Sequence, residues 1–166
     1  CCTGKDYNNK KNYLELLLSK RVDGIILAGS QFVENTSKHN NDYIINAAKD
    51  VPIVLVNGYL DADNIYSVMC NDEEAVYNAT KLLINNSHRN IVYLYTSTSY
   101  SGMNKYRGYL KAINEAGITL PDEFHHLCGK NISHARDYLT YLYDKGMKFD
   151  AVMTSDDSIA AGAVKF

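Results

Sequence analysis

The chain has 166 residues, 46% of them apolar and 22% charged, and it carries a net charge of −2. This is the composition of a globular protein long enough to bury a core. No apolar run approaches the roughly 18 residues that span a bilayer, and no secretory leader opens the sequence. The lysines and arginines are scattered, whereas a nucleic-acid surface usually needs a concentrated basic stripe. Composition therefore favours a globular protein whose own residues do not read DNA.

The four cysteines follow no recognisable pattern. They are Cys1, Cys2, Cys70 and Cys128. Their spacing matches no zinc module and gives a poor disulfide framework, so we expect reduced thiols in a cytoplasmic protein. His125 and His126 precede Cys128 closely, but alternate side chains of a strand point to opposite faces, so only His126 and Cys128 would share one. Two ligands are too few for zinc, and we expect no metal.

Short apolar runs and amphipathic segments alternate along the chain. Strands are predicted at 24–27, 53–56, 65–69, 91–95, 124–127 and 151–154. Helices are predicted around 13–18, 44–48, 76–83, 103–113 and 135–142 and from Ser158 onward, because apolar residues recur there at helical spacing. The apolar stripe of the third helix is expected at Val76, Ala79 and Leu83. Asp72 is predicted to cap the third of these helices, and Asp156 or Asp157 the last. Alternation about every 30 residues predicts an α/β fold, with a parallel sheet and helices on both faces.

Four segments that follow predicted strands are rich in small polar side chains. They are 28–31, 57–59, 96–101 and 155–157. On parallel sheets, ligands bind beyond the carboxyl ends of the strands. The sequence has no phosphate-binding loop, no dinucleotide-binding glycine motif and no nucleophile elbow. We therefore expect a binding site without catalytic residues and without a cofactor.

Six motifs, in order, resemble those of the lactose/galactose repressor family. The family patterns, with the residues of this chain that resemble them, are V-D-G-I-I-L at 22–27, P-V-V-x-[ILV]-D at 52–57, V-x-x-D-N at 68–72, L-x-x-x-G-H-x-x-I at 82–91, R-x-x-G-[YF] near 107–109 and D-A-I-x-x-x-N-D-x-x-A-x-G-A at 150–163. The chain departs from them at several positions. Asn57 replaces an Asp, Ser87 replaces a Gly, the acid and amide near 71–72 are exchanged, and Arg107 is adjacent to Gly108.

The resemblance implies two linked subdomains of periplasmic-binding-protein type, with an effector in the cleft between them. Residues 1–70 would form part of the N-terminal subdomain and 71–166 part of the C-terminal one, with the crossover near Cys70 and Asn71. The family's DNA-binding helix-turn-helix of about 60 residues, its first strand and helix, and its elements after Phe166 have no counterpart in the sequence. We therefore expect a piece of a longer protein, whose open sheet edges are covered by neighbouring chains or by unseen segments.

Two charged residues are predicted to contact the effector. Asp157 follows a strand and begins a helix; it is either a helix cap or an acceptor for sugar hydroxyls, because a carboxylate can take two charge-assisted hydrogen bonds. Arg107 follows the 96–101 loop beside the apolar helix stripe; it is either a surface residue or a fork for adjacent hydroxyls or a carboxylate. Asp156 is predicted to be the structural partner.

Three uncharged residues complete the predicted site. Asn57 is either a turn residue with Gly58 or an amide that bonds the ligand. Ser30 and Tyr100 are further candidates, and so is Tyr59, since an aromatic ring can stack on the apolar face of a sugar. His88 is instead predicted to cap the carbonyls at the end of a helix.

The predicted function is the effector-sensing and dimerisation part of a bacterial transcription repressor. A sugar or sugar phosphate would bind, and a homodimer would bind operator DNA through the missing N-terminal domain. One alternative is the solute-binding protein of a sugar transporter, which would need a secretory leader. A second is a flavodoxin-like or Rossmann enzyme, which the missing phosphate-loop glycines disfavour.

Overall fold

A computed structural model of the chain describes residues 4, 6–33, 38–129 and 131–166. The chain divides into two compact units, one of residues 1–70 with 99–101 and the other of residues 71–98 with 102–166. Within the described ranges, no helix is long and apolar enough to cross a membrane. Cys1 and Cys2 lie outside these ranges; Cys70 is an exposed free thiol and Cys128 a buried one.

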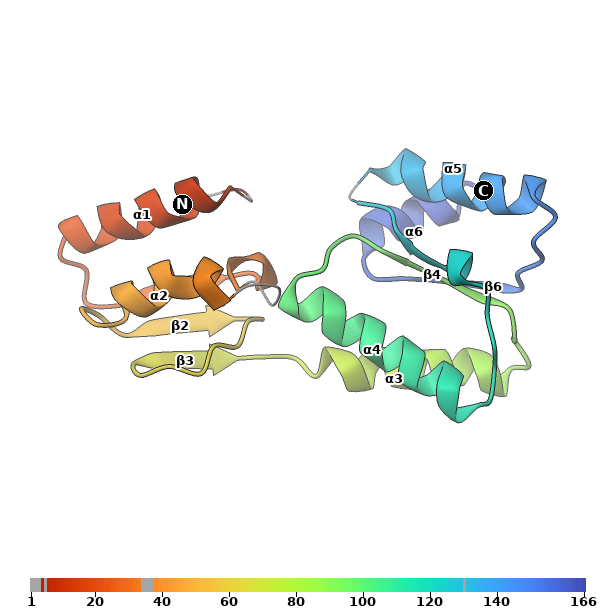
Figure 1. Cartoon of the computed structure of the whole chain (residues 1–166), viewed down its shortest axis with the longest axis horizontal. Helices are drawn as coiled ribbons and strands as arrows, with labels where there is room; N and C mark the ends of the chain where they lie inside the picture. The colour runs from red at the N-terminus through yellow and green to blue at the C-terminus, as the bar shows by residue number, and fades with distance from the viewer. Residues whose placement is uncertain (1–3, 5, 34–37, 130) are drawn as a thin grey trace. The chain divides into compact units, whose positions relative to one another are not determined.

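The first unit is a three-stranded parallel sheet in the order β1-β2-β3. Its elements are α1 (Tyr7–Ser19), β1 (Ile25–Ala28), η1 (Ser30–Phe32), η2 (Lys38–Asn41), α2 (Asp42–Ala47), β2 (Ile53–Val56) and β3 (Ile65–Val68). Ile25 pairs with Ile53, and Ile53 with Ile65. One hydrophobic core joins the inward side chains of β1 and β2 to Leu14 of α1 and Ile44 of α2. Both helices therefore cover the same face of this sheet (Figure 1).

The second unit is a three-stranded parallel sheet in the order β5-β4-β6. Its elements are α3 (Asp72–Asn85), β4 (Ile91–Tyr95), α4 (Tyr100–Glu115, whose first two residues group with the first unit), η3 (Asp122–Phe124), β5 (His125–Leu127), α5 (Ile132–Asp144), β6 (Ala151–Thr154) and α6 (Asp157–Ala163). The chain passes from β4 out to β5 and then returns across β4 to β6. Since crossovers are right-handed, this reversal places α4 and α5 on opposite faces of the sheet, as Figure 1 shows.

Strand β4 is buried on both faces. Ile91 and Tyr93 pack in a core with α3 and α4, whereas Val92 and Leu94 pack in a second core with α5 and α6. All four side chains have no exposed surface. A continuous apolar run is the pattern of a strand covered on both sides, so the composition of 91–95 follows from this position.

Tyrosine rings fill the core between β4 and α4. The rings of Tyr93 and Tyr109 stack with centroids 4.8 Å apart, and those of Tyr95 and Tyr106 stack at 5.3 Å. His125 meets Tyr106 edge-on, and the Tyr106 hydroxyl lies 3.1 Å from its Nδ1. Burial raises the pKa of Tyr93 and Tyr109. Both hydroxyls are therefore neutral at physiological pH.

The structure confirms the predicted α/β class and all six predicted strands, and it corrects some details. Asn71, not Asp72, caps α3, because its side-chain oxygen accepts the Glu74 N–H at 3.2 Å. The buried stripe of α3 includes Thr80, whose hydroxyl bonds the Val76 carbonyl; Ala79, placed in that stripe by its spacing, is exposed.

Candidate functional site

The carboxyl ends of β4 and β6 meet at one edge of the second sheet. Because the strand order reverses around β4, this edge is where parallel sheets open a crevice for ligands. Three bonds join the two loops: Ser155 N–H donates to the Leu94 carbonyl at 2.9 Å, Thr96 N–H to Ser155 Oγ at 3.1 Å, and Thr96 Oγ1 to Asp156 at 2.6 Å. The loops after β4 and β6 thus form one hydrogen-bonded surface.

Asp156 holds this surface together. As the N-cap of α6, it accepts hydrogen bonds from Ser158 N–H at 3.1 Å and Ile159 N–H at 3.4 Å, besides the one from Thr96. Burial pushes the pKa of Asp156 upward, but the hydrogen bonds from Ser158 and Thr96 outweigh it and hold the pKa below its ordinary value. The carboxylate is ionised and already satisfied, which agrees with the structural role predicted for it.

Asp157, the next residue, is the exposed carboxylate of the same loop. It is the first residue of α6. Within the ranges that the structure describes, its side chain makes no hydrogen bond or ion pair. A carboxylate that makes no hydrogen bond within the protein can accept hydrogen bonds from a ligand.

Lys105 brings a cation to this edge. Its Nζ donates to the Ser155 carbonyl at 3.0 Å, and its side chain is half-buried on α4. The ammonium has two further protons to donate. We did not select Lys105 from the sequence, although a signal was present: counted back three residues from Gly108, the first position of the R-x-x-G-[YF] motif falls on Lys105.

Arg107 points toward α3. Its Nε lies 3.3 Å from Glu73 Oε2, and its Nη2 donates to Asn104 Oδ1. The side chain is exposed. Residues two positions apart on a helix differ by about 200° of rotation, so Lys105 and Arg107 point in different directions. A ligand contact by Arg107 would compete with its contact to Glu73.

The other predicted residues group with the first unit. Asn57 directly follows β2 with a positive φ of 59°, and its N–H donates to the Val68 carbonyl at 2.8 Å. Ser30 begins η1 and lies with its Oγ 3.1 Å from Ser99 Oγ. The rings of Tyr59 and Tyr100 lie 6.4 Å apart between centroids. The structure thus brings Ser30 close to Ser99 and Tyr59 close to Tyr100, and it places Asn57 at the end of the neighbouring strand.

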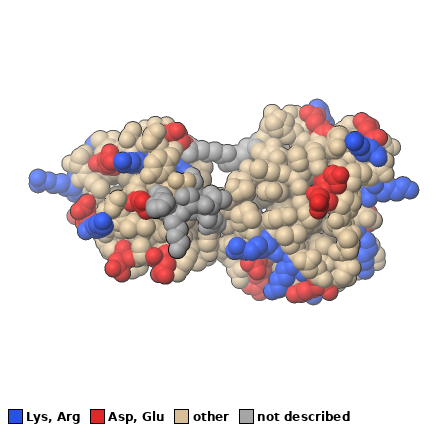
Figure 2. Space-filling model, in the orientation of Figure 1, with Lys and Arg blue, Asp and Glu red and all other residues tan. Residues whose placement is uncertain are grey.

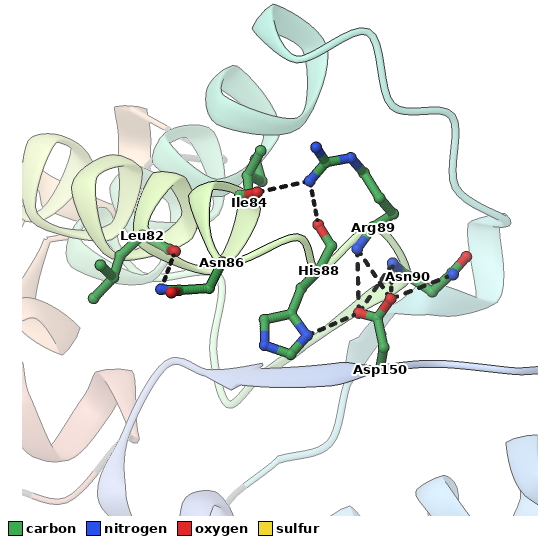
Figure 3. A network of polar contacts seen from close by, with 7 residues as sticks. All are labelled: Leu82, Ile84, Asn86, His88, Arg89, Asn90 and Asp150. Atoms are coloured by element: carbon green, nitrogen blue, oxygen red, sulfur yellow. Dashed lines mark hydrogen bonds and ion pairs between the residues drawn. The ribbon is translucent and has the colours of Figure 1, made fainter.

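A second polar network lies at the opposite edge of the second sheet, where β4 and β6 begin (Figure 3). The Asp150 carboxylate accepts the N–H groups of Arg89 and Asn90 at 3.0 and 3.1 Å, and His88 Nδ1 lies 3.4 Å from it. Burial pushes the pKa of Asp150 upward, but these backbone hydrogen bonds lower it below its ordinary value. The network clamps the starts of the two strands.

His88 only partly fulfils its predicted role. Its backbone N–H caps the Leu83 carbonyl at 3.1 Å, and the Ser87 N–H caps the Ile84 carbonyl at 3.0 Å, which is a Schellman ending of α3. The imidazole, however, faces Asp150 and bonds no helix carbonyl. Ser87 adopts the left-handed φ of 73° that this ending requires, which explains why the family motif has glycine there.

The two histidines of β5 lie on opposite faces, as predicted. His125 contacts Tyr106 of α4, whereas His126 stacks on Tyr138 of α5 with centroids 3.5 Å apart. Within the described part of the chain, no three His, Cys, Asp or Glu side chains are grouped so as to hold a metal ion. On the face shown in Figure 2, acidic and basic side chains are interspersed and form no basic stripe.

Comparison with known proteins identifies the class. A family described as "Periplasmic binding proteins and sugar binding domain of LacI family" matches residues 2–166. The chain therefore belongs to this family, as its motifs indicate.

Individual relatives agree with this assignment. An HTH-type transcriptional regulator of Lachnoclostridium phytofermentans is 43% identical over the whole chain, which spans 50% of that protein. The HTH-type transcriptional repressor PurR of Mannheimia succiniciproducens is 31% identical over 126 residues, 75% of this chain and 36% of that protein. A solved structure, a sugar-binding transcriptional regulator of the LacI family from Escherichia coli in complex with phosphate, superimposes with a TM-score of 0.77 at 26% identity, covering 96% of this chain and 56% of that one. The chain thus spans at most about half the length of these curated relatives.

Proposed function

We propose that this chain is the effector-sensing part of a bacterial transcription repressor and that its ligand is a sugar or a sugar phosphate. The observation that carries the proposal is the pair of charged groups at one sheet edge: the unpartnered Asp157 carboxylate and the Lys105 ammonium on the Ser155 carbonyl. Membership of the LacI family and relatives named as transcriptional regulators support the biological role.

This pair of groups suits a polyhydroxylated ligand. A carboxylate accepts hydrogen bonds from two neighbouring hydroxyls, and an ammonium donates to a hydroxyl or a phosphate oxygen. Thr96 bonds Ser155 and Asp156 across the two loops, and the Ser155 carbonyl holds the Lys105 ammonium. Asn57, Ser30 and Tyr100 remain proposed ligand contacts from the first unit, and Arg107 remains a rival to Lys105.

The rest of the function is proposed for the whole protein. The units of residues 1–70 and 71–166 would be parts of the two subdomains of the effector domain. A ligand that binds one conformation more tightly than another shifts the population toward it, and only through that difference in affinity. We propose that the complete protein is a cytoplasmic homodimer that binds operator DNA through a separate N-terminal domain and has no enzymatic activity. The relatives named as regulators favour this reading over a transporter's solute-binding protein.

The test is thermal unfolding of the complete protein against a panel of sugars and sugar phosphates. At about a hundred times its dissociation constant, a ligand stabilises the native state by roughly 2.7 kcal/mol. We expect one compound to raise Tm, and Asp157→Asn and Lys105→Met to remove that shift. Arg107→Ala is the matched variant, because it deletes a cation from the same helix that is held by Glu73.

The outcomes separate the site from the ligand class. Loss of the shift in Arg107→Ala but not in Lys105→Met would assign the cation to Arg107 and contradict the arrangement proposed above. If no sugar or sugar phosphate shifts Tm in the unsubstituted protein, the proposed ligand class is wrong, and nucleosides, amino acids or a protein corepressor become the candidates.

A further inference from the structure

The first unit contains an open cavity between the end of α2 and the connection from β2 to β3. Its volume is about 530 Å³, within the roughly 300–1,000 Å³ that is typical of small-molecule sites. All of its lining residues lie shortly before β2 or β3, so the cavity belongs to the amino-terminal edge of the sheet and not to the edge of Asn57. The lining consists of Ile45, Ala48, Lys49, Asp61, Ala62 and Asp63.

Asn64 fixes the two walls of this cavity to each other. Its Nδ2 donates to the Ala48 carbonyl at 2.8 Å, and its own carbonyl accepts the Ile53 N–H at 3.0 Å. Leu60, from the same connection, packs against the hydrophobic core of the unit. The walls are therefore in place before a ligand arrives, and little ordering of the chain opposes binding.

The floor of the cavity is apolar. Ala48 is buried, and the side chains of Ile45 and Ala62 are half-buried. Methylene groups pack on such a surface while a charged end group stays at the rim. The floor therefore suits a ligand with a short apolar stem.

The rim carries three charged side chains that do not pair with one another. Within the described ranges, the carboxylates of Asp61 and Asp63 make no hydrogen bond or ion pair, although a lysine lines the same cavity. The Lys49 ammonium instead donates to Asn46 Oδ1 at 2.9 Å, which leaves it two further protons. Two carboxylates and one ammonium give the rim a formal charge of −1. The cavity thus offers two sites for cations and one for an anion.

We propose that this cavity binds a basic α-amino acid, of the class of lysine, ornithine or arginine. Such a ligand has two cationic groups for Asp61 and Asp63, one carboxylate for Lys49 and a methylene stem for the apolar floor. Its net charge of +1 neutralises the rim. A diamine lacks the carboxylate and is repelled by Lys49, and an apolar amino acid leaves one of the two aspartates without a counterpart. The proposal does not rest on the sugar site, which lies in other residues.

The test is isothermal titration calorimetry of the complete protein with L-lysine at concentrations up to about 10 mM. Ionic strength is held constant, because exposed charges are screened by salt. Two analogues serve as matched ligands: norleucine lacks the terminal ammonium, and cadaverine lacks the carboxylate. We expect L-lysine to bind and each analogue to have a Kd at least about threefold higher, since each has lost one exposed ionic contact.

Three variants assign the contacts. Asp61→Asn and Asp63→Asn should each raise the Kd of L-lysine at least about threefold. Lys49→Met should weaken L-lysine but strengthen cadaverine, because it removes an attraction in the first case and a repulsion in the second. All three side chains are exposed, so the substitutions leave the fold intact. Asp144→Asn, at an exposed acid of the second unit, is the control and should change neither Kd.

The outcomes distinguish this site from the sugar site. Binding of L-lysine that persists in Asp157→Asn and is weakened in Asp61→Asn supports the cavity whether or not any sugar binds. Absence of L-lysine binding to the unsubstituted protein, or binding that ignores Asp61→Asn and Asp63→Asn, overturns the inference. If cadaverine binds as tightly as L-lysine and Lys49→Met affects neither, the proposed amino-acid class is wrong.

Discussion

Asp150 connects three consecutive residues by a single carboxylate. It accepts the backbone N–H groups of Arg89 and Asn90 and faces the His88 ring, so that the starts of β4 and β6 stay in register. Arg89 strengthens the same corner, since its guanidinium donates to the Ile84 and His88 carbonyls at 2.7 and 2.9 Å (Figure 3). The aspartate that opens the last family motif in the sequence therefore has a structural role.

Asp150→Asn should lower the free energy of unfolding by about 1 kcal/mol at pH 7, because an amide oxygen is a weaker acceptor than a half-exposed carboxylate. The folded pKa of Asp150 is lowered. The stabilisation that Asp150 gives to the folded state is thus complete above the pKa of the unfolded chain, 3.8. It is lost as the pH falls through the lower pKa that Asp150 has in the folded state. Urea unfolding between pH 2.5 and 7 should show the variant and the parent converging below about pH 4. A constant difference over the whole range would contradict this. Asp144→Asn, at an exposed acid of α5, is the control.

Helix α4 approaches α3 closely through one glycine. A Cβ at Gly108 would lie 2.2 Å from the Glu73 carbonyl oxygen and 2.9 Å from the Tyr77 nitrogen. Gly162 of α6 allows the same close approach to α5 on the other face of the sheet, where a Cβ would lie 2.1 Å from the Ile132 carbonyl oxygen. In both places the obstacle is backbone, which cannot move aside as a flexible side chain would. The Gly-Tyr pair of the R-x-x-G-[YF] motif is therefore a packing requirement: Gly108 faces α3, and Tyr109 enters the core.

Gly108→Ala should destabilise the chain by roughly 2–3 kcal/mol, even though alanine is intrinsically better in a helix by about 1 kcal/mol. The reason is that α3 and α4 must separate to admit the methyl group. Urea unfolding at pH 7 measures the change. The control is Ala79→Gly at an exposed position of α3, which should cost only the helix-propensity difference. A neutral or stabilising Gly108→Ala would show that the two helices are not packed as closely as described.

The sequence predicted the elements well, but it did not reveal what surrounds each of the charged side chains proposed for the site. Strands were readable because their apolar runs are fully buried, as in 91–95. One position of the α3 stripe was wrong: Val76 and Leu83 pack against the core as predicted, but Thr80 is buried instead of Ala79. The Thr80 hydroxyl bonds the Val76 carbonyl, which apolar spacing does not reveal. Lys105 was not selected because the family motif was placed on Arg107, two residues further along. The bond of Lys105 to the Ser155 carbonyl and the contact of Arg107 with Glu73 distinguish the two cations, and neither contact is visible in the sequence. Asp157 could be selected from the sequence because it directly follows a predicted strand and begins a predicted helix.

At the scale of the whole molecule, the two units differ in how completely they are enclosed. The second sheet has a core on each face, whereas the first has a core on one face only. Burial of apolar surface is the main favourable contribution to folding, so the first unit, taken alone, is the less stable of the two. The difference follows from strand order, which is a property of the chain path and not of any single residue.

Hydrogen exchange should reveal this difference in the 166-residue chain. We expect the amides of β2, the central strand of the first sheet, to exchange at least tenfold faster than those of β4, because local opening costs less where fewer apolar contacts are broken. Exchange followed by mass spectrometry at neutral pH measures both in one experiment. Equal protection of β2 and β4 would contradict the ranking of the two units.

The tyrosine layer between β4 and α4 also gives the chain an optical signature. The sequence has no tryptophan, so its near-ultraviolet absorption and emission come almost wholly from tyrosine. Four of these rings, Tyr93, Tyr95, Tyr106 and Tyr109, are held nearly parallel in the second unit. Fixed, chirally arranged chromophores at this separation couple to one another, whereas isolated surface tyrosines do not. The near-ultraviolet circular dichroism of this chain therefore carries a contribution from this layer of the second unit, beside that of the Tyr7–Tyr43 pair in the first unit.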